Sequence, residues 1–235
     1  MAYDGTNFHG FQVQNDLRCV QSELEKALLV ITKKKTKVYG AGRTDAGVHA
    51  YGQVFHFDFD VEMKCENMRN AINCRLPSDI RITKIEHVDD NFHARFSAKS
   101  KTYQYLVDFN EPNPLLVNYR WFYKYKIDKE LLYECAKLFI GTHDFKAFTK
   151  NHKLENTVRT IYSLDLSEKD GLMTITFKGN GFLHNQVRII VAMMFEVARK
   201  KMPLCDLKNA LESLDRKKAP KTAPANGLYL VNIEY

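Results

Sequence analysis

The glycine-rich segment at residues 40–50 (GAGRTDAGVHA) holds the side chains best suited to chemistry. It has three glycines within eight residues, and glycine permits positive φ and close backbone approach to a ligand. Arg43, Thr44 and Asp45 lie at its centre. A carboxylate near a guanidinium stays ionised and can act as nucleophile or base. The segment therefore predicts a loop with Asp45 as a candidate catalytic residue. A bulged hairpin with Asp45 in an Asx turn explains the same residues.

Two other kinds of site fit this segment less well. The GAG start does not complete a GxGxxG motif and no helix is predicted after it, which disfavours dinucleotide binding. His49 and His56 are separated by six residues across a loop and a strand, a spacing that is not typical of metal ligands. The loop also allows a hydrolase in which Asp45 and His49 form an acid/base pair.

Residues 92–103 (FHARFSAKSKTY) interleave basic and aromatic side chains. This mixture suits a nucleic acid, because cations neutralise phosphates and aromatic rings stack on bases. Arg95, Lys99 and Lys101 are the candidate contacts. A basic edge strand, protected from aggregation by its lysines, would have the same composition.

Two later segments are open to more than one interpretation. Residues 178–188 (KGNGFLHNQVR) predict a glycine turn that opens a helix, with Arg188 one turn into it. Arg188 can reach a site at the helix N-terminus or cover the surface. Residues 119–125 (YRWFYKY) combine aromatic rings and charge, which the packing of an edge strand explains equally well.

The composition points to an anionic partner. The chain has 235 residues and a net charge of +7, and its sequence pI is near 9.0. Such a balance favours RNA or DNA binding, although a basic surface also serves solubility. With 45% hydrophobic and 27% charged residues, the chain can bury a sizeable core, which excludes global disorder.

The cysteines and the N-terminus indicate a cytoplasmic protein. The number of cysteines is odd and no CxxC occurs, which disfavours a disulfide framework and a zinc ribbon; they are Cys19, Cys65, Cys74, Cys135 and Cys205. The first residues lack the basic and apolar regions of a signal peptide. No apolar run of about 18 residues occurs, so no membrane helix is predicted.

Hydrophobic periodicity predicts both helices and strands. Helices are predicted over residues 18–32, 65–76, 184–201 and 204–214, and between an Asp128 N-cap and Gly141. Strands are predicted over residues 53–59, 79–88, 102–109 and 228–235, with a hairpin at Asp170-Gly171 between residues 158–166 and 172–178. Short turns between strands favour antiparallel pairing, so we predict an α+β fold rather than a doubly wound α/β fold.

Seven motifs, in order along almost the whole chain, resemble those of TruA-type tRNA pseudouridine synthases: YDGTNFHGFQ, GRTDAGVHA, CRLP, FHARFSAKSKTYQY, GTHDFKAF, GNGFLHNQVRIIV and APANGLYL. GRTDAGVHA is highly specific to this family. Family members carry several more residues before YDGT, whereas only Met1 and Ala2 precede it here. This difference predicts a shortened first strand or a misassigned start site.

The resemblance implies an isomerase that converts uridine to pseudouridine in the anticodon stem-loop of tRNA, at positions 38 to 40. No group is gained or lost, so it implies no redox cofactor, nucleotide or metal. The resemblance also implies a pseudouridine synthase fold, in which helices flank a central, mainly antiparallel sheet. Two similar α+β halves, residues 1–101 and 102–235, would surround a basic cleft in a symmetric homodimer.

The resemblance also assigns roles to individual residues. Asp45 is the implied nucleophile, Tyr103 the active-site tyrosine that stacks on uracil, and Arg188 the basic partner of the aspartate. Leu228 packs near the base, while the implied substrate contacts include Arg43, Thr44, His49, Arg95, Lys99 and Lys101. Which tRNA positions react, and whether Asp45 attacks C1′ or C6, stay open. A non-catalytic RNA-binding protein on the same fold is the other alternative, besides the hydrolase.

Overall fold

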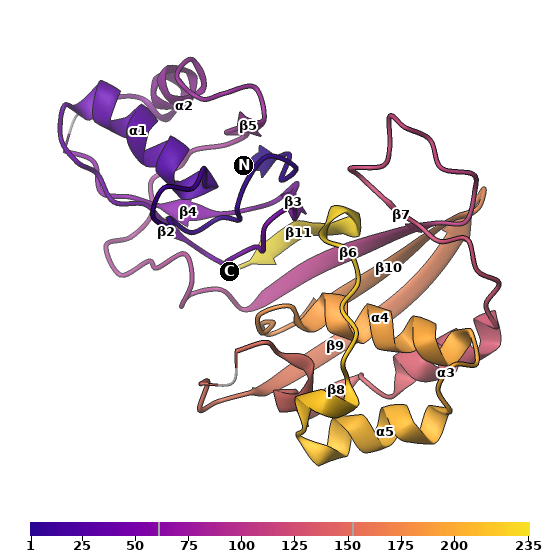
Figure 1. Ribbon diagram of the computed structural model, residues 1–235. Coiled ribbons are helices and arrows are strands. Elements are labelled where there is room, and N and C mark those ends of the chain that lie inside the picture. Colours follow the sequence, from indigo (N-terminus) through magenta and orange to yellow (C-terminus); the bar gives the residue numbers. More distant parts are fainter. Residues whose placement is uncertain (61, 152) are drawn as a thin grey trace. The chain divides into compact units, whose positions relative to one another are not determined.

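The computed structural model describes residues 1–60, 62–151 and 153–235, and these fall into two units that each combine helices with strands (Figure 1). Unit 1 contains Met1–Lys99 and Tyr229–Tyr235, and unit 2 contains Ser100–Leu228. The predicted α+β class with mainly antiparallel pairing is confirmed. Residues Tyr229–Tyr235 belong to unit 1, where Tyr229 pairs with His49.

Unit 1 is built from short strands and two helices. Strand β1 (Ala2–Tyr3) pairs antiparallel with both β3 (His49–Ala50) and β5 (Ile80–Arg81). Strand β11 (Leu228–Glu234) runs parallel to β3, with Tyr229 opposite His49. A second ladder joins β2 (Tyr39–Gly40) to β4 (Phe55–His56).

The first helix matches its prediction closely. Helix α1 (Val20–Thr32) buries the predicted apolar stripe, with Val20, Leu24 and Leu28 inaccessible to solvent. At its start the Cys19 N–H donates to Ser22 Oγ at 3.3 Å, which satisfies a backbone donor outside the helical pattern. The helix ends at Lys33, which adopts a left-handed conformation.

Three predicted elements of unit 1 are shorter than expected. Helix α2 (Cys65–Asn73) ends before residue 76, and the side chain of its last residue, Asn73, bonds both the backbone N–H and the carbonyl of Ile82. The expected strands at 53–59 and 79–88 contract to the two-residue strands β4 and β5. Their strand partners are themselves only two residues long.

Unit 2 is organised around one antiparallel sheet in the order β6-β10-β9-β8. These strands span Ser100–Asp108, Leu172–Gly179, Val158–Lys169 and Gly141–Asp144, respectively. The predicted hairpin between β9 and β10 is confirmed, with Asp170 and Gly171 both at positive φ. Along β6 the side chains of Tyr103, Tyr105 and Val107 are buried, as the alternation predicts.

Unit 2 also contains the helices α3 (Lys129–Lys137), α4 (Gln186–Ala198) and α5 (Leu204–Ser213) (Figure 1). Asp128 caps α3 as predicted, since its side chain accepts from the Leu131 N–H. Helix α4 packs against both α3 and α5, and nearly all of its residues are buried. Short 3-10 turns span Lys146–Phe148, Arg216–Lys218 and Ala225–Gly227.

The aromatic stretch at residues 119–125 forms a short edge strand. Strand β7 (Trp121–Phe122) pairs with the end of β6 in parallel. Nearby, the buried Asp108 carboxylate accepts from Arg120 at 2.9 Å and from the Asn110 side chain at 2.9 Å. Burial acts to raise the pKa of Asp108, but these hydrogen bonds outweigh it and hold the pKa below its usual value.

Across the described residues, no helix has both the length and the apolar composition needed to cross a membrane.

Because its pKa is lowered in the folded state, Asp108 stabilises the protein above the carboxyl pKa of the unfolded chain, about 3.9. We expect Asp108→Asn to lower the free energy of unfolding by about 1–3 kcal/mol at pH 7. The difference from wild type should shrink as the pH falls below about 4. Urea unfolding at several pH values measures this, with the exposed Asp165→Asn as control. A difference independent of pH would contradict the assignment.

Candidate active site

The loop at residues 41–48, here called the Asp45 loop, connects β2 to β3 in unit 1. The Ala41 N–H donates to the Val54 carbonyl at 2.8 Å, and Gln53 Nε2 donates to the Gly42 carbonyl at 2.9 Å. Within the loop Arg43 is exposed, Thr44 is buried and Asp45 is half-buried. The carboxylate therefore lies on a loop whose first residues are hydrogen-bonded to Gln53 and Val54, just before β4.

Residues 3–11, the N-terminal segment, hold this loop from a second direction. Tyr3 Oη and Thr44 Oγ1 are 2.8 Å apart, a hydrogen-bond distance. The Phe11 N–H donates to the Thr44 carbonyl at 3.2 Å, and the Gly47 N–H donates to the Phe8 carbonyl at 3.2 Å. Burial raises the pKa of Tyr3 to about 12, so its hydroxyl stays neutral at physiological pH.

Two glycines allow this close approach. A Cβ atom at Gly10 would lie 2.5 Å from the Thr44 carbonyl oxygen, and Gly10 has a φ of +88°. At Gly5 a Cβ atom would lie 2.1 Å from the Val48 carbonyl oxygen. Any other residue at either position would push the backbone of the Asp45 loop away.

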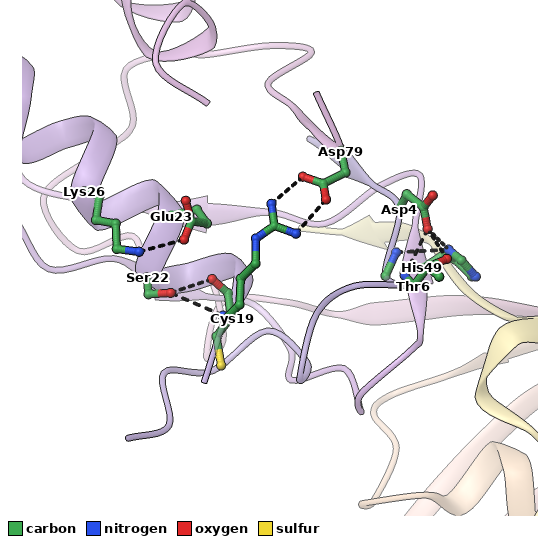
Figure 2. Close-up of polar contacts among 10 residues, drawn as sticks. Asp4, Thr6, Cys19, Ser22, Glu23, Lys26, His49 and Asp79 are labelled. Carbon is green, nitrogen blue, oxygen red and sulfur yellow. Dashed lines mark hydrogen bonds and ion pairs between the residues drawn. The ribbon is translucent and has the colours of Figure 1, made fainter. Parts of the chain in front are cut away.

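The N-terminal segment is fixed on its other side by helix α1. The Val20 and Gln21 N–H groups, at the start of the helix, donate to the carbonyls of Gly10 and Phe11 at 3.2 and 2.9 Å. These bonds satisfy donors that a helix N-terminus leaves unpaired. Next to them Arg18 makes a bidentate ion pair with Asp79, at 2.7 and 2.9 Å (Figure 2).

His49 lies at the end of the Asp45 loop and is only 2% exposed. Its Nδ1 accepts from the Gly5 N–H at 3.0 Å, and its ring stacks on Tyr229 with centroids 4.7 Å apart. Figure 2 shows Asp4 beside His49 and Thr6; Asp4 Oδ1 accepts from the Thr6 N–H and hydroxyl. His49 thus contacts both the N-terminal segment, through Gly5, and strand β11, through Tyr229.

Four of the candidate residues, Lys101, Tyr103, Arg188 and Leu228, lie in unit 2. Lys101 and Tyr103 are on β6, and Lys101 is opposite Gly179, the last residue of β10. The turn after Gly179 leads into α4 and carries Phe182, which meets the Tyr103 ring edge-to-face at 5.2 Å. Leu228 follows the 3-10 turn that precedes β11.

Arg188 is held in place by a bond to the chain near residue 223. Its Nε donates to the Ala223 carbonyl at 2.8 Å, and the Ala223 N–H donates to the Arg188 carbonyl at 3.0 Å. One residue further on, the Pro224 carbonyl accepts from Tyr105 Oη at 2.8 Å. Burial raises the pKa of Tyr105, and the positive charge of Arg188 opposes this rise.

The remaining basic candidates, Arg95 and Lys99, are exposed in unit 1. Arg95 lies in a turn rather than a strand, because the Ser97 N–H donates to the His93 carbonyl at 2.9 Å. The predicted site residues are therefore divided: Asp45 is in unit 1, and Tyr103, Arg188 and Leu228 are in unit 2. The pairing of Asp45 with Arg188 stays a prediction.

The predictions from sequence gave no role to the residues that position Asp45 in unit 1 or Arg188 in unit 2. Tyr3, Gly5 and Gly10 of the N-terminal segment shape the Asp45 loop, and Ala223 orients Arg188. The two glycines of this segment, Gly5 and Gly10, stand among larger side chains, and this pattern could have predicted a close approach to another part of the backbone. Among the residues that the structure describes, no cluster of three His, Cys, Asp or Glu side chains could hold a metal ion.

Comparison with known proteins identifies the family of this chain. Residues 1–97 and 135–235 match a family model described as tRNA pseudouridine synthase. A tRNA pseudouridine synthase A from Streptococcus thermophilus (strain CNRZ 1066) is 46% identical, covering 100% of this chain and 97% of the relative. Proteins of the same name from Limosilactobacillus reuteri (strain DSM 20016) and Geobacillus sp. (strain WCH70) are 46% and 44% identical. These matches cover 100% of this chain, and 94% and 96% of the respective relatives.

The α+β units and the rigid carboxylate loop thus belong to an RNA-modifying class of enzyme. The chain belongs to the tRNA pseudouridine synthase family, and it is an isomerase that acts on tRNA.

The Tyr3 hydroxyl offers a stability test of the contact with the Asp45 loop. We expect Tyr3→Phe to lower the free energy of unfolding by about 0.5–1.5 kcal/mol, because the buried Thr44 hydroxyl loses its partner. Urea denaturation measures this difference. Tyr162→Phe, on an exposed side chain of β9, is the matched control and should be neutral. Equal stability of the two variants would show that the contact contributes nothing.

Proposed function

We propose that the protein converts uridine to pseudouridine in the anticodon stem-loop of tRNA, at positions 38 to 40, with Asp45 as the nucleophile. The observation that carries this proposal is the half-buried Asp45 on a loop fixed from two directions. A nucleophile needs a defined position, because small misplacements of reacting atoms are costly to rate. The resemblance of the seven motifs supports the choice of stem-loop.

The proposed reaction rearranges one nucleotide without adding or removing a group. The bond from N1 of uracil to C1′ of ribose breaks, and Asp45 forms a transient covalent bond to C1′ or C6. The uracil turns, C5 bonds to C1′, C5 loses its proton and N1 gains one. Such covalent catalysis splits a difficult substitution into two easier steps.

Tyr103 and Arg188 complete the proposed chemistry. Tyr103 would stack on the uracil and remove the C5 proton late in the reaction. The Arg188 guanidinium would pair with Asp45 and keep it ionised. The bond from Arg188 Nε to the Ala223 carbonyl supports this role, because it restrains the guanidinium while using one of its five donors. Leu228 would pack against the base.

The substrate uridine must leave its stack to react, which costs a few kcal/mol. We propose that Arg43 helps to extrude it, that Arg95, Lys99 and Lys101 contact phosphates, and that Thr44 and His49 belong to the substrate-binding loop. The net charge of +7 supports such contacts, because cations displace counterions from RNA. From the family resemblance we further propose a cytoplasmic homodimer with a basic cleft and no metal, nucleotide or other cofactor.

The test is nucleoside analysis of an unmodified tRNA transcript after incubation with wild type and with Asp45→Asn. The amide is nearly isosteric but is a much poorer nucleophile, so we expect the rate of pseudouridine formation to fall by roughly a thousandfold or more. Binding of tRNA should change little. Mapping the product should place it at positions 38 to 40.

Three outcomes separate the alternatives. Turnover by Asp45→Asn close to that of wild type would contradict a nucleophilic Asp45. Free uracil as the product would indicate a hydrolase instead of an isomerase. Binding of tRNA by wild type without any product would favour a non-catalytic RNA-binding protein.

A further inference from the structure

Six side chains form a continuous row in unit 1. Lys37 Nζ lies 5.1 Å from the Tyr39 ring, which stacks on His56 at 5.0 Å. His56 contacts His93 at 4.7 Å, and His93 contacts Phe96 at 4.4 Å. Arg95 closes the row with its guanidinium 5.7 Å from the Phe96 ring. Aromatic rings thus occupy the middle of the row and cations its two ends.

Strand pairing and hydrogen bonds from backbone N–H groups hold this row in place. Tyr39 and His56 are opposite each other on β2 and β4. His56 Nδ1 accepts from the Ala94 N–H at 3.1 Å, and His93 Nδ1 accepts from the Arg95 N–H at 3.1 Å. Each bond uses the lone pair of Nδ1 and so orients its ring. Burial lowers the pKa of His56, and the neighbouring His93 adds to this effect.

Phe96 is the exposed end of the aromatic part. It is 77% exposed although one side of its ring meets His93. A single exposed apolar side chain is common in proteins. Phe96 differs because a turn holds it in place, with the His93 N–H donating to Ser97 Oγ at 3.0 Å and a guanidinium beside its ring. A rigid, exposed ring next to a cation loses little entropy on binding a flat partner.

We propose that Phe96 is a stacking platform for an unpaired base of the substrate RNA, with Arg95 and Lys37 contacting the flanking phosphates. Aromatic rings accept any base face, and neighbouring cations neutralise the backbone. Strand β2, which carries Tyr39, leads directly into the Asp45 loop. The platform and the nucleophile are therefore on one framework, and the stacked base belongs to the same tRNA as the target uridine. This inference rests on the proposed function.

The test compares the affinity of an unmodified tRNA transcript for wild type, Phe96→Ala and Phe96→Leu. Loss of one stacked base should weaken binding by roughly five- to tenfold for Phe96→Ala. Phe96→Leu should rescue little, because it restores apolar area without a π face. KM should rise with affinity loss while kcat stays near wild type. Leu115→Ala, on a side chain 82% exposed in unit 2, is the control and should match wild type.

A spectroscopic variant reports the contact itself. Phe96→Trp keeps a stacking ring, so it should bind tRNA as wild type does, and its emission should fall when tRNA binds. Wild type, with Trp121 as its single tryptophan, gives the background. If Phe96→Ala binds tRNA as tightly as wild type does, while wild type makes pseudouridine, the stacking role of Phe96 is contradicted. The proposed function would then be unaffected. A change of oligomeric state without a change in affinity would also contradict the stacking role, by assigning the ring to a protein interface.

Discussion

The close contact between the N-terminal segment and the Asp45 loop is the constraint on which the rest of unit 1 depends. Gly5 and Gly10 let the two backbones approach to distances that no side chain would permit. The loop gains hydrogen bonds from Tyr3 and Phe11, and the segment gains partners at the start of α1. A carboxylate on an otherwise mobile glycine-rich loop is thereby given a defined position.

Unit 2 uses a different means of positioning. Arg188 and Tyr103 project from regular elements, α4 and β6, whose packing is set by a buried core. The chain near residue 223 then orients Arg188 through its Ala223 carbonyl, and the adjacent Pro224 carbonyl binds Tyr105. A Cβ atom at Gly227 would lie 2.8 Å from the Leu106 carbonyl oxygen, so this return of the chain also needs a glycine.

The sequence predicted the long elements well and the short ones poorly. Helix α1, strand β6 and the hairpin at Asp170-Gly171 have strong periodicity or turn chemistry, and all three are present. Strands β4 and β5 were predicted too long, because pairing with two-residue partners limits a strand more than its own propensity does. An edge strand was one of the interpretations of residues 119–125, but the sequence could not predict its parallel pairing with β6.

Sequence also identified Asp45 as a candidate, since an acid in a glycine-rich loop is informative by itself. The supports of that loop were not predictable in the same way. They come from residues about 40 positions away, such as Tyr3 with Thr44, and depend on tertiary contacts that no local pattern encodes. His49 is a further example, because its burial and its stacking on Tyr229 depend on a strand about 180 residues further along the chain.

The turnover number of Gly10→Ala on saturating unmodified tRNA tests the positioning of Asp45 most directly. The added methyl group would meet the Thr44 carbonyl, at a residue with positive φ, and so displace the residue next to Asp45. The account predicts a correctly folded variant whose kcat is at least about tenfold lower, with KM changed by less than about twofold. A kcat equal to that of wild type would contradict the claim that this contact sets the position of the nucleophile.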